Sequence, residues 1–206
     1  GFDQTVYILP IPTDKPGNLE KGFQIIEDWA HNALLTDKDI DEERNVVLEE
    51  SRLGKGADDR MAKKYLPKML SNSRYADRLP IGKDEILKNF KHDEVRRFYR
   101  DWYRPNEMAV IVVGDITVEK AKEMINKHFA GLTNPANQRE RIYPEVKPYS
   151  EASAMVLSDP EATNFEFNIM FSSRKKTEEK TLKDYRDYLI RNLFNQMLNK
   201  RFQDLS

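Results

Sequence analysis

The chain has 206 residues, 39% of them hydrophobic and 33% charged, a length that suits one large domain or one domain joined to part of another. It has no cysteine, which excludes disulfide scaffolds, thiol catalysis and cysteine-bound metal centres. Its 34 basic and 35 acidic side chains give no bias towards nucleic acid, and no apolar run approaches the roughly 20 residues of a membrane-spanning helix.

The first half of the chain is expected to begin with a strand and to continue as helices. A β-branched and aromatic run over residues 5–9 stops at Pro10 and Pro12, as strands do at a sheet edge. Asp39 and Glu42 resemble a capping box at a helix start. Apolar residues spaced by three or four predict helices over residues 19–34, 39–54, 58–70 and 95–102, with a short one from residue 84.

The second half is expected to alternate strands with helices. The apolar run over residues 108–113 (MAVIVV) suits a strand buried on both faces, and Thr117 caps a helix that runs to Phe129. Residues 165–171 alternate aromatic with polar side chains, which indicates a core strand or an exposed edge that pairs with a peptide. A further strand over residues 154–157 and a long helix over 182–202 complete the prediction.

These elements predict an α+β fold in which helices cover a mixed or antiparallel sheet. Apolar periodicity disappears in a proline-containing polar stretch, which divides the chain into a first domain (1–133), a linker (134–151) and the start of a second domain (152–206). A strand close to residue 1 needs a partner, and no Gly or Pro stops the last helix at Phe202. The sequence therefore predicts a truncated chain, a fragment of something longer.

The densest acidic feature is the segment 42–50 (EERNVVLEE). Residues seven apart lie two turns apart on nearly the same helix face, so Glu43 aligns with Glu50, and Glu42 aligns equally well with Glu49. A carboxylate that shares its face with apolar side chains is costly unless it binds a cation or a hydrogen-bond donor. Spacing alone does not choose between the two pairs, and a fully solvated helix face remains open.

Four segments in chain order resemble the M16 family of zinc metallopeptidases, which includes pitrilysin, insulin-degrading enzyme and the mitochondrial processing peptidases. Within that family the chain most resembles the long bacterial PqqL-like zinc proteases. The family usually has Gly where Asn45 stands, and often an aromatic residue where Ser51 stands. The resemblance covers nearly the whole chain and is carried by residues 43–50 (ERNVVLEE), 74–82 (RYADRLPIG), 98–106 and 108–115.

The resemblance implies a zinc site to which this chain contributes one ligand. In the family, an inverted His-x-x-Glu-His motif on one helix and a glutamate from a later helix hold the metal. By motif match that glutamate is Glu50, and Glu43 corresponds to a supporting glutamate. No His-x-x-Glu-His occurs in this sequence. Its three histidines, His31, His92 and His128, are too widely spaced to chelate a metal from one helix. We therefore expect zinc in the parent protein and none bound to this chain alone.

The resemblance implies a zinc endopeptidase that hydrolyses peptides or unfolded polypeptides, and it suggests a bacterial periplasmic or envelope location. The partners it implies are a peptide substrate, the N-terminal part of the zinc-bearing domain and the second half of the peptidase. Two other functions remain open: a non-catalytic M16-like partner or scaffold subunit, and a binding module without catalysis. The arginines around Arg96 share their helix with acids and indicate a solvated face, and Gly54-Lys55-Gly56 lacks the spacing of a phosphate loop.

Overall fold

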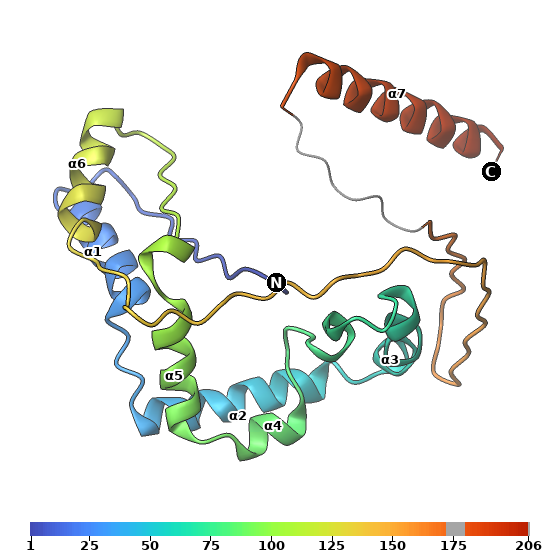
Figure 1. Cartoon of the computed structure of the whole chain (residues 1–206), viewed down its shortest axis with the longest axis horizontal. Coiled ribbons are helices and arrows are strands. Elements are labelled where there is room, and N and C mark those ends of the chain that lie inside the picture. The colour runs from blue at the N-terminus through green and yellow to red at the C-terminus, as the bar shows by residue number, and fades with distance from the viewer. Residues whose placement is uncertain (172–179, 206) are drawn as a thin grey trace. The chain divides into compact units, whose positions relative to one another are not determined.

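The computed structural model describes residues 1–171 and 180–205 (Figure 1). Contacts between Cα atoms divide the chain into two compact units. The first unit comprises Gly1–Lys147 and Glu151–Phe167, and the second comprises Pro148–Ser150 and Asn168–Ser206.

Helices form where the spacing of apolar residues predicts them. The α-helices are α1 (Asn18–His31), α2 (Asp37–Leu53), α3 (Ala57–Met69), α4 (Asp84–Asn89), α5 (His92–Trp102), α6 (Val118–Phe129) and α7 (Leu182–Leu205), and the short 3-10 helices are η1 (Arg74–Asp77) and η2 (Pro105–Glu107). The start of α2 differs from the prediction, because Thr36 caps it: the Thr36 hydroxyl accepts a hydrogen bond from the Asp39 N–H. Thr117 caps α6 as predicted.

The expected α+β fold is wrong: across residues 1–171 and 180–205 the regular structure is helical and no strand forms. The segments 5–9, 108–113, 154–157 and 165–171 have no regular secondary structure. Among the described residues none of them forms a backbone hydrogen bond to a second segment, and the Met108 N–H bonds to the nearby Pro105 carbonyl at 3.2 Å. An extended segment becomes a strand only when a neighbour pairs with its N–H and C=O groups. Nor is the run 108–113 buried on both faces, since Ile111 and Val113 are 83% and 91% exposed.

In the first unit, α1 packs against α6 (Figure 1). Phe23 of α1 and Met124 of α6 are buried, with 3% and 2% of their surface exposed. The ring of His128 stacks on Phe23 with centroids 5.8 Å apart, and its Nδ1 lies 2.6 Å from Glu27 Oε2. Burial of these side chains between two amphipathic helices makes a small apolar core.

A second contact in this unit sets α2 beside α4, and α5 follows α4 directly in the chain (Figure 1). Ile40 of α2 is buried. α5 also contacts α1, because the Tyr99 hydroxyl of α5 donates a hydrogen bond to the Trp29 carbonyl of α1 at 2.8 Å. The segment from α4 to α5 therefore supports α2 on one side.

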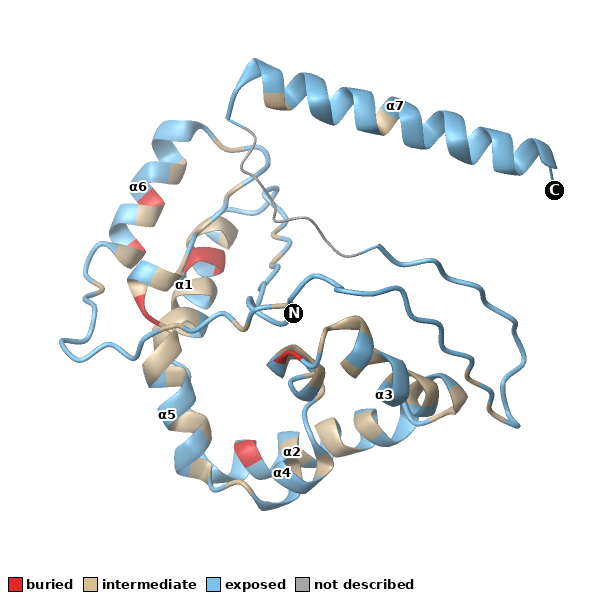
Figure 2. Cartoon of the chain, turned by 45° about the vertical axis from the view of Figure 1, so that its right-hand side comes forward, coloured by how far each residue is buried: buried red, intermediate tan, exposed pale blue. Residues whose placement is uncertain are grey.

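Many large apolar side chains are exposed, and Figure 2 shows few buried positions on the described chain. In the second unit, no residue of α7 is buried, and Leu182 and Leu205 are 88% and 84% exposed. Phe165 and Phe171 are 93% and 87% exposed. Among the described helices none combines the length and the apolar character needed to cross a membrane.

Arg60 of α3 forms ion pairs with Asp159 and Glu161, each at 2.6 Å. The Arg60 guanidinium lowers the pKa of Asp159 from 3.8 to about 2. A carboxyl whose pKa is lowered by folding stabilises the folded state above its unfolded pKa, and this contribution disappears as the pH falls through the folded pKa. The pair should therefore stabilise the first unit at neutral pH and lose its effect between pH 3.8 and about 2.

We expect Arg60→Met to lower the melting temperature above about pH 4, and the difference from wild type to vanish as the pH approaches 2. Thermal unfolding followed by circular dichroism across this range measures the difference. Lys63→Met is the matched control, because the ion pair that Lys63 forms among the described residues is with Asp59 of the same helix. A melting-temperature difference for Arg60→Met that stays constant down to pH 2 would contradict the assignment.

Candidate functional site

Helix α2 carries both glutamates that the sequence singles out. Its start is fixed by the Thr36 cap and by Asp37 and Asp39 in the first turn, where carboxylates stabilise the helix N-terminus. Arg52 in the last turn stabilises the C-terminal end of the helix, where a positive charge is favourable, and the helix ends at Leu53 before Gly54. The whole acidic segment is therefore helical, as the spacing argument requires.

The contacts separate the two carboxylate pairs that spacing alone left equivalent. Glu42 pairs with Lys38 at 3.8 Å, and Glu49 accepts hydrogen bonds from Arg52 at 2.6 and 2.8 Å. The Arg52 guanidinium also lowers the pKa of Glu49. Within the described part of the chain, Glu43 and Glu50 are exposed and form no side-chain hydrogen bond or ion pair. Their carboxylates are free to accept a ligand.

Glu43 and Glu50 share one helix face with Val47, which is partly buried between them. Seven residues of helix span about 10 Å along the axis. The two carboxylates are therefore too far apart along α2 to bind the same metal ion directly. If Glu50 binds the metal, Glu43 can act on it only through another group that lies between them.

The histidines lie elsewhere. His31 Nδ1 lies 3.0 Å from the Glu27 carbonyl, and His128 is buried with its Nε2 3.3 Å from Glu20 Oε1. His92 lies against the start of α2, on a different face from Glu50. Across residues 1–171 and 180–205, no three side chains of the His, Asp and Glu types form a group that could hold a metal ion.

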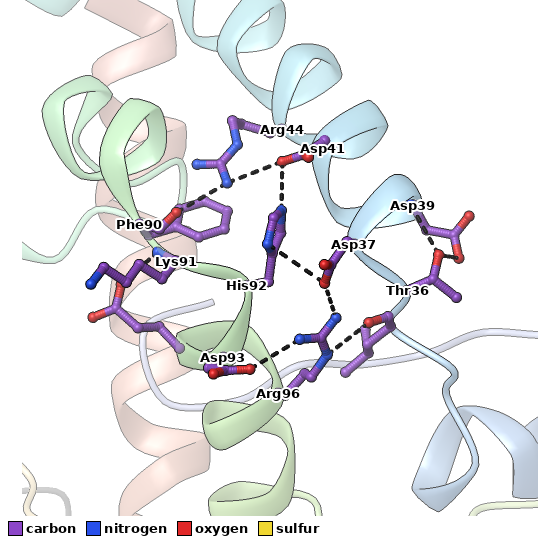
Figure 3. Close-up of polar contacts among 12 residues, drawn as sticks. Thr36, Asp37, Asp39, Asp41, Arg44, Phe90, Lys91, His92, Asp93 and Arg96 are labelled. Atoms are coloured by element: carbon purple, nitrogen blue, oxygen red, sulfur yellow. Dashed lines mark hydrogen bonds and ion pairs between the residues drawn. The ribbon is translucent and has the colours of Figure 1, made fainter.

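A polar network joins the first turns of α2 to the start of α5 (Figure 3). His92 lies between two carboxylates, with Nε2 2.9 Å from Asp41 Oδ1 and Nδ1 3.5 Å from Asp37 Oδ1. Arg96 pairs with Asp37 and donates a hydrogen bond to the Leu35 carbonyl. The Arg96 and His92 side chains lower the pKa values of Asp37 and Asp41 respectively.

Arg44 and Ser51 continue these contacts along α2. Arg44 donates hydrogen bonds from Nη1 to the Leu87 carbonyl at 2.6 Å and from Nη2 to the Phe90 carbonyl at 3.0 Å. Ser51 donates a hydrogen bond to Asp84 Oδ1 at 2.6 Å. Lys55 also pairs with Asp84, and Lys55 and Ser51 together lower the pKa of this carboxyl.

The sequence reasoning missed this network, although a signal for it exists. Residues 37, 41, 44, 48 and 51 follow one another at intervals of three or four, which places them on one face of α2. Four of the five are polar, so a search for apolar periodicity alone passes over them.

Gly54, Lys55 and Gly56 line a cavity of about 270 Å³ at the start of α3. Asp58, Asp59 and Glu161 also line it. An acidic lining repels anions, so this cavity does not suit a phosphate.

The chain is similar to known peptidases over most of its length. The profile of the family described as Peptidase M16 inactive domain matches residues 89–205, which leaves α2 outside the matched range. A zinc protease PQQL-like protein of Arabidopsis thaliana is 31% identical over 206 residues, covering 99% of this chain and 21% of that protein. The probable zinc protease PqqL of Escherichia coli is 30% identical over 207 residues, covering 98% of this chain and 22% of that protein.

A similar solved structure comes from the same kind of protein as these relatives. The crystal structure of the first half of the periplasmic protease PqqL from Escherichia coli superposes with a TM-score of 0.61 at 32% identity, covering 68% of this chain and 30% of that chain. The chain spans about a fifth of the length of the two curated relatives above. The similarity to both relatives covers nearly the whole chain, so it includes the residues of α2.

Proposed function

The chain belongs to the M16 peptidase family, and from this premise we propose that it forms part of a zinc endopeptidase that hydrolyses peptides or unfolded polypeptides. In this proposal residues 1–133 are the C-terminal part of the zinc-bearing domain. Residues 134–151 are a linker, and residues 152–206 begin a second domain of similar kind. The names of the relatives, which are zinc proteases, support the type of reaction.

One observation carries the proposal. On a helix whose other glutamates are paired with Lys38 and Arg52, Glu43 and Glu50 are exposed and free of ion pairs among the described residues. They are also the glutamates that match the family motif. A carboxylate with no cation of its own is a suitable zinc ligand.

We assign Glu50 as a metal ligand and Glu43 as a supporting carboxylate near it. Zinc held by two imidazoles and one carboxylate lowers the pKa of a bound water to about 7, which supplies the nucleophile of a metallopeptidase. In this site the chain contributes one negatively charged ligand, at a fixed position on α2. The general base and both histidines belong to the His-x-x-Glu-His motif, which this sequence does not contain.

We expect the 206-residue chain alone to cleave no peptide, because it lacks the two imidazole ligands and the base. The longer protein that contains it should cleave an unfolded, fluorescently labelled polypeptide, lose that activity in 1,10-phenanthroline and regain it on addition of zinc. Chelator-sensitive cleavage by the longer protein and none by the chain supports the proposal. Robust cleavage by the purified chain alone would contradict it.

A second candidate function is a non-catalytic partner or scaffold subunit. The description of the matching family profile as an inactive domain favours it. The two candidates differ in the segment before residue 1 of the longer protein, where an intact His-x-x-Glu-His motif indicates a peptidase and a degraded motif indicates a partner subunit.

We also propose a periplasmic or cell-envelope location, because the E. coli protease of the superposed structure is described as periplasmic. Fractionation of the source cells, with an antibody against the chain, tests this location.

A further inference from the structure

One face of α2 is held by the segment that runs from α4 to the start of α5. We call this face the anchoring stripe; its polar members are Asp37, Asp41, Arg44 and Ser51. Each member contacts residues 84–96, either through a side chain, as with His92, Arg96 and Asp84, or through backbone carbonyls. Figure 3 shows the contacts of Asp37, Asp41 and Arg44. The contacts extend from the first turn of the helix to the last.

The anchoring stripe has a fixed relation to the two candidate site glutamates. Glu43 immediately precedes Arg44, and Glu50 immediately precedes Ser51. Because successive residues of an α-helix are about 100° apart around the axis, both glutamates lie about 100° from the stripe in the same direction. Any contact that fixes the rotation of α2 about its axis therefore fixes where both carboxylates lie.

Arg44 makes the most specific of these contacts. Its side chain is only 14% exposed, and its guanidinium lies over the Phe90 ring, 3.8 Å from the centroid. Besides a hydrogen bond to Asp41 of its own helix, it donates two to the backbone carbonyls of Leu87 and Phe90, at the C-terminal end of α4. Carbonyls at a helix C-terminus have no intrahelical donor, so Arg44 satisfies two acceptors that would otherwise need water.

The geometry of an arginine suits this task. The planar guanidinium reaches two carbonyls in fixed directions and stacks on an aromatic ring at the same time, whereas the ammonium of lysine is a compact charge with neither a fixed fork of donors nor a plane that can stack. A carboxylate lies about 5–6 Å from a helix axis, so a rotation of about 10° displaces it by about 1 Å. Metal and catalytic sites tolerate only about 0.5 Å.

We infer that Arg44 is a positioning residue: by bonding the C-terminal carbonyls of α4, it fixes the rotation of α2 and so aims Glu50, with Glu43, at the metal. This inference rests on the proposed function. In this role Arg44 acts through α2 and does not itself bind the metal or the substrate. Ser51 adds a second contact at the end of α2, through its hydrogen bond to Asp84.

The test uses the longer protein that contains this chain, with the variants Arg44→Ala, Arg44→Lys, Arg52→Ala and Glu50→Gln. Arg52 is the matched control, because it lies on the same helix and hydrogen-bonds to Glu49 of that helix. Zinc affinity is measured by competition with a chromogenic chelator. Melting of the metal-free protein and the visible spectrum of the Co²⁺ form are measured in parallel.

We expect Arg44→Ala to weaken zinc binding by about 10–100-fold, as loss of the partners that orient a ligand typically does. The Co²⁺ spectrum should change with it, and Arg44→Lys should bind zinc nearly as weakly. Added guanidinium ion should restore part of the affinity of Arg44→Ala, and Arg52→Ala should match wild type. If Arg44→Ala does not fold, Arg44→Lys decides the question by the same measurements.

The outcomes separate this inference from the proposed function. If Glu50→Gln retains full zinc, the proposed function fails. If Glu50→Gln loses zinc while both Arg44 variants bind it with wild-type affinity, only the positioning role fails. A lower melting temperature for Arg44→Ala with unchanged zinc affinity and an unchanged Co²⁺ spectrum would likewise overturn the inference, because it would show a role in stability alone.

Discussion

Replacing Glu50 by glutamine in the longer protein that contains this chain is expected to abolish stoichiometric zinc and to lower peptidase activity by more than about 100-fold. Glutamine keeps the size of the side chain but removes the negative charge that a zinc ligand supplies. Among the described residues Glu50 is exposed and has no ion pair or side-chain hydrogen bond to lose. The substitution should therefore change the free energy of unfolding of the metal-free protein by no more than about 0.5 kcal/mol.

Metal content by atomic emission, together with thermal melting of the metal-free protein, measures both effects. Glu49→Gln is the matched control: it is the adjacent residue and breaks a surface pair with Arg52, yet it should keep full zinc. Glu43→Gln should weaken zinc binding by about 10–100-fold without abolishing it, as expected for a supporting group. Full zinc in the Glu50→Gln protein, or loss of zinc in the Glu49→Gln protein, would refute the assignment of Glu50.

The helices could be predicted from the sequence because their signals are local. Apolar spacing of three to four residues and caps such as Thr117 depend on neighbours a few positions away, and α1, α3, α6 and α7 follow them closely. Strands depend on a second segment. The run 108–113 has the composition of a strand, but its alternate residues Ile111 and Val113 are exposed, and its backbone pairs with no second segment in the described chain.

The candidate site shows the same division between local and distant information. The spacing of seven residues aligns Glu43 with Glu50 and, equally, Glu42 with Glu49. What separates the pairs is the ion pairs of Glu42 and Glu49 with Lys38 and Arg52, four and three residues away on the same helix. This signal is local too, but it appears only when the spacing of the basic residues is considered together with that of the acids. The bonds from Arg44 to Leu87 and Phe90 join residues more than 40 positions apart, so the periodicity of α2 alone could not predict them.

Replacing Phe23 by alanine is expected to destabilise the first unit by about 3–5 kcal/mol, the usual cost of removing a buried phenylalanine ring from a core. Phe23 is 3% exposed and contacts the stacked ring of His128, so the cavity would open in the middle of the contact between α1 and α6. The described part of the chain has few other buried apolar side chains, and of these Met124 belongs to the same contact. Urea unfolding followed by circular dichroism measures the loss.

The control for this prediction lies two residues further along α1. Ile25 is 39% exposed, so Ile25→Ala removes a side chain that is already partly in water and should cost clearly less than Phe23→Ala. Phe23→Leu keeps most of the apolar volume and should cost less than about 1.5 kcal/mol. If Phe23→Ala proved no more costly than Ile25→Ala, the contact between α1 and α6 would not carry the stability of the first unit. The anchoring stripe of α2 would then be the main tertiary contact of this unit, and Arg44→Ala should destabilise it more than Phe23→Ala does.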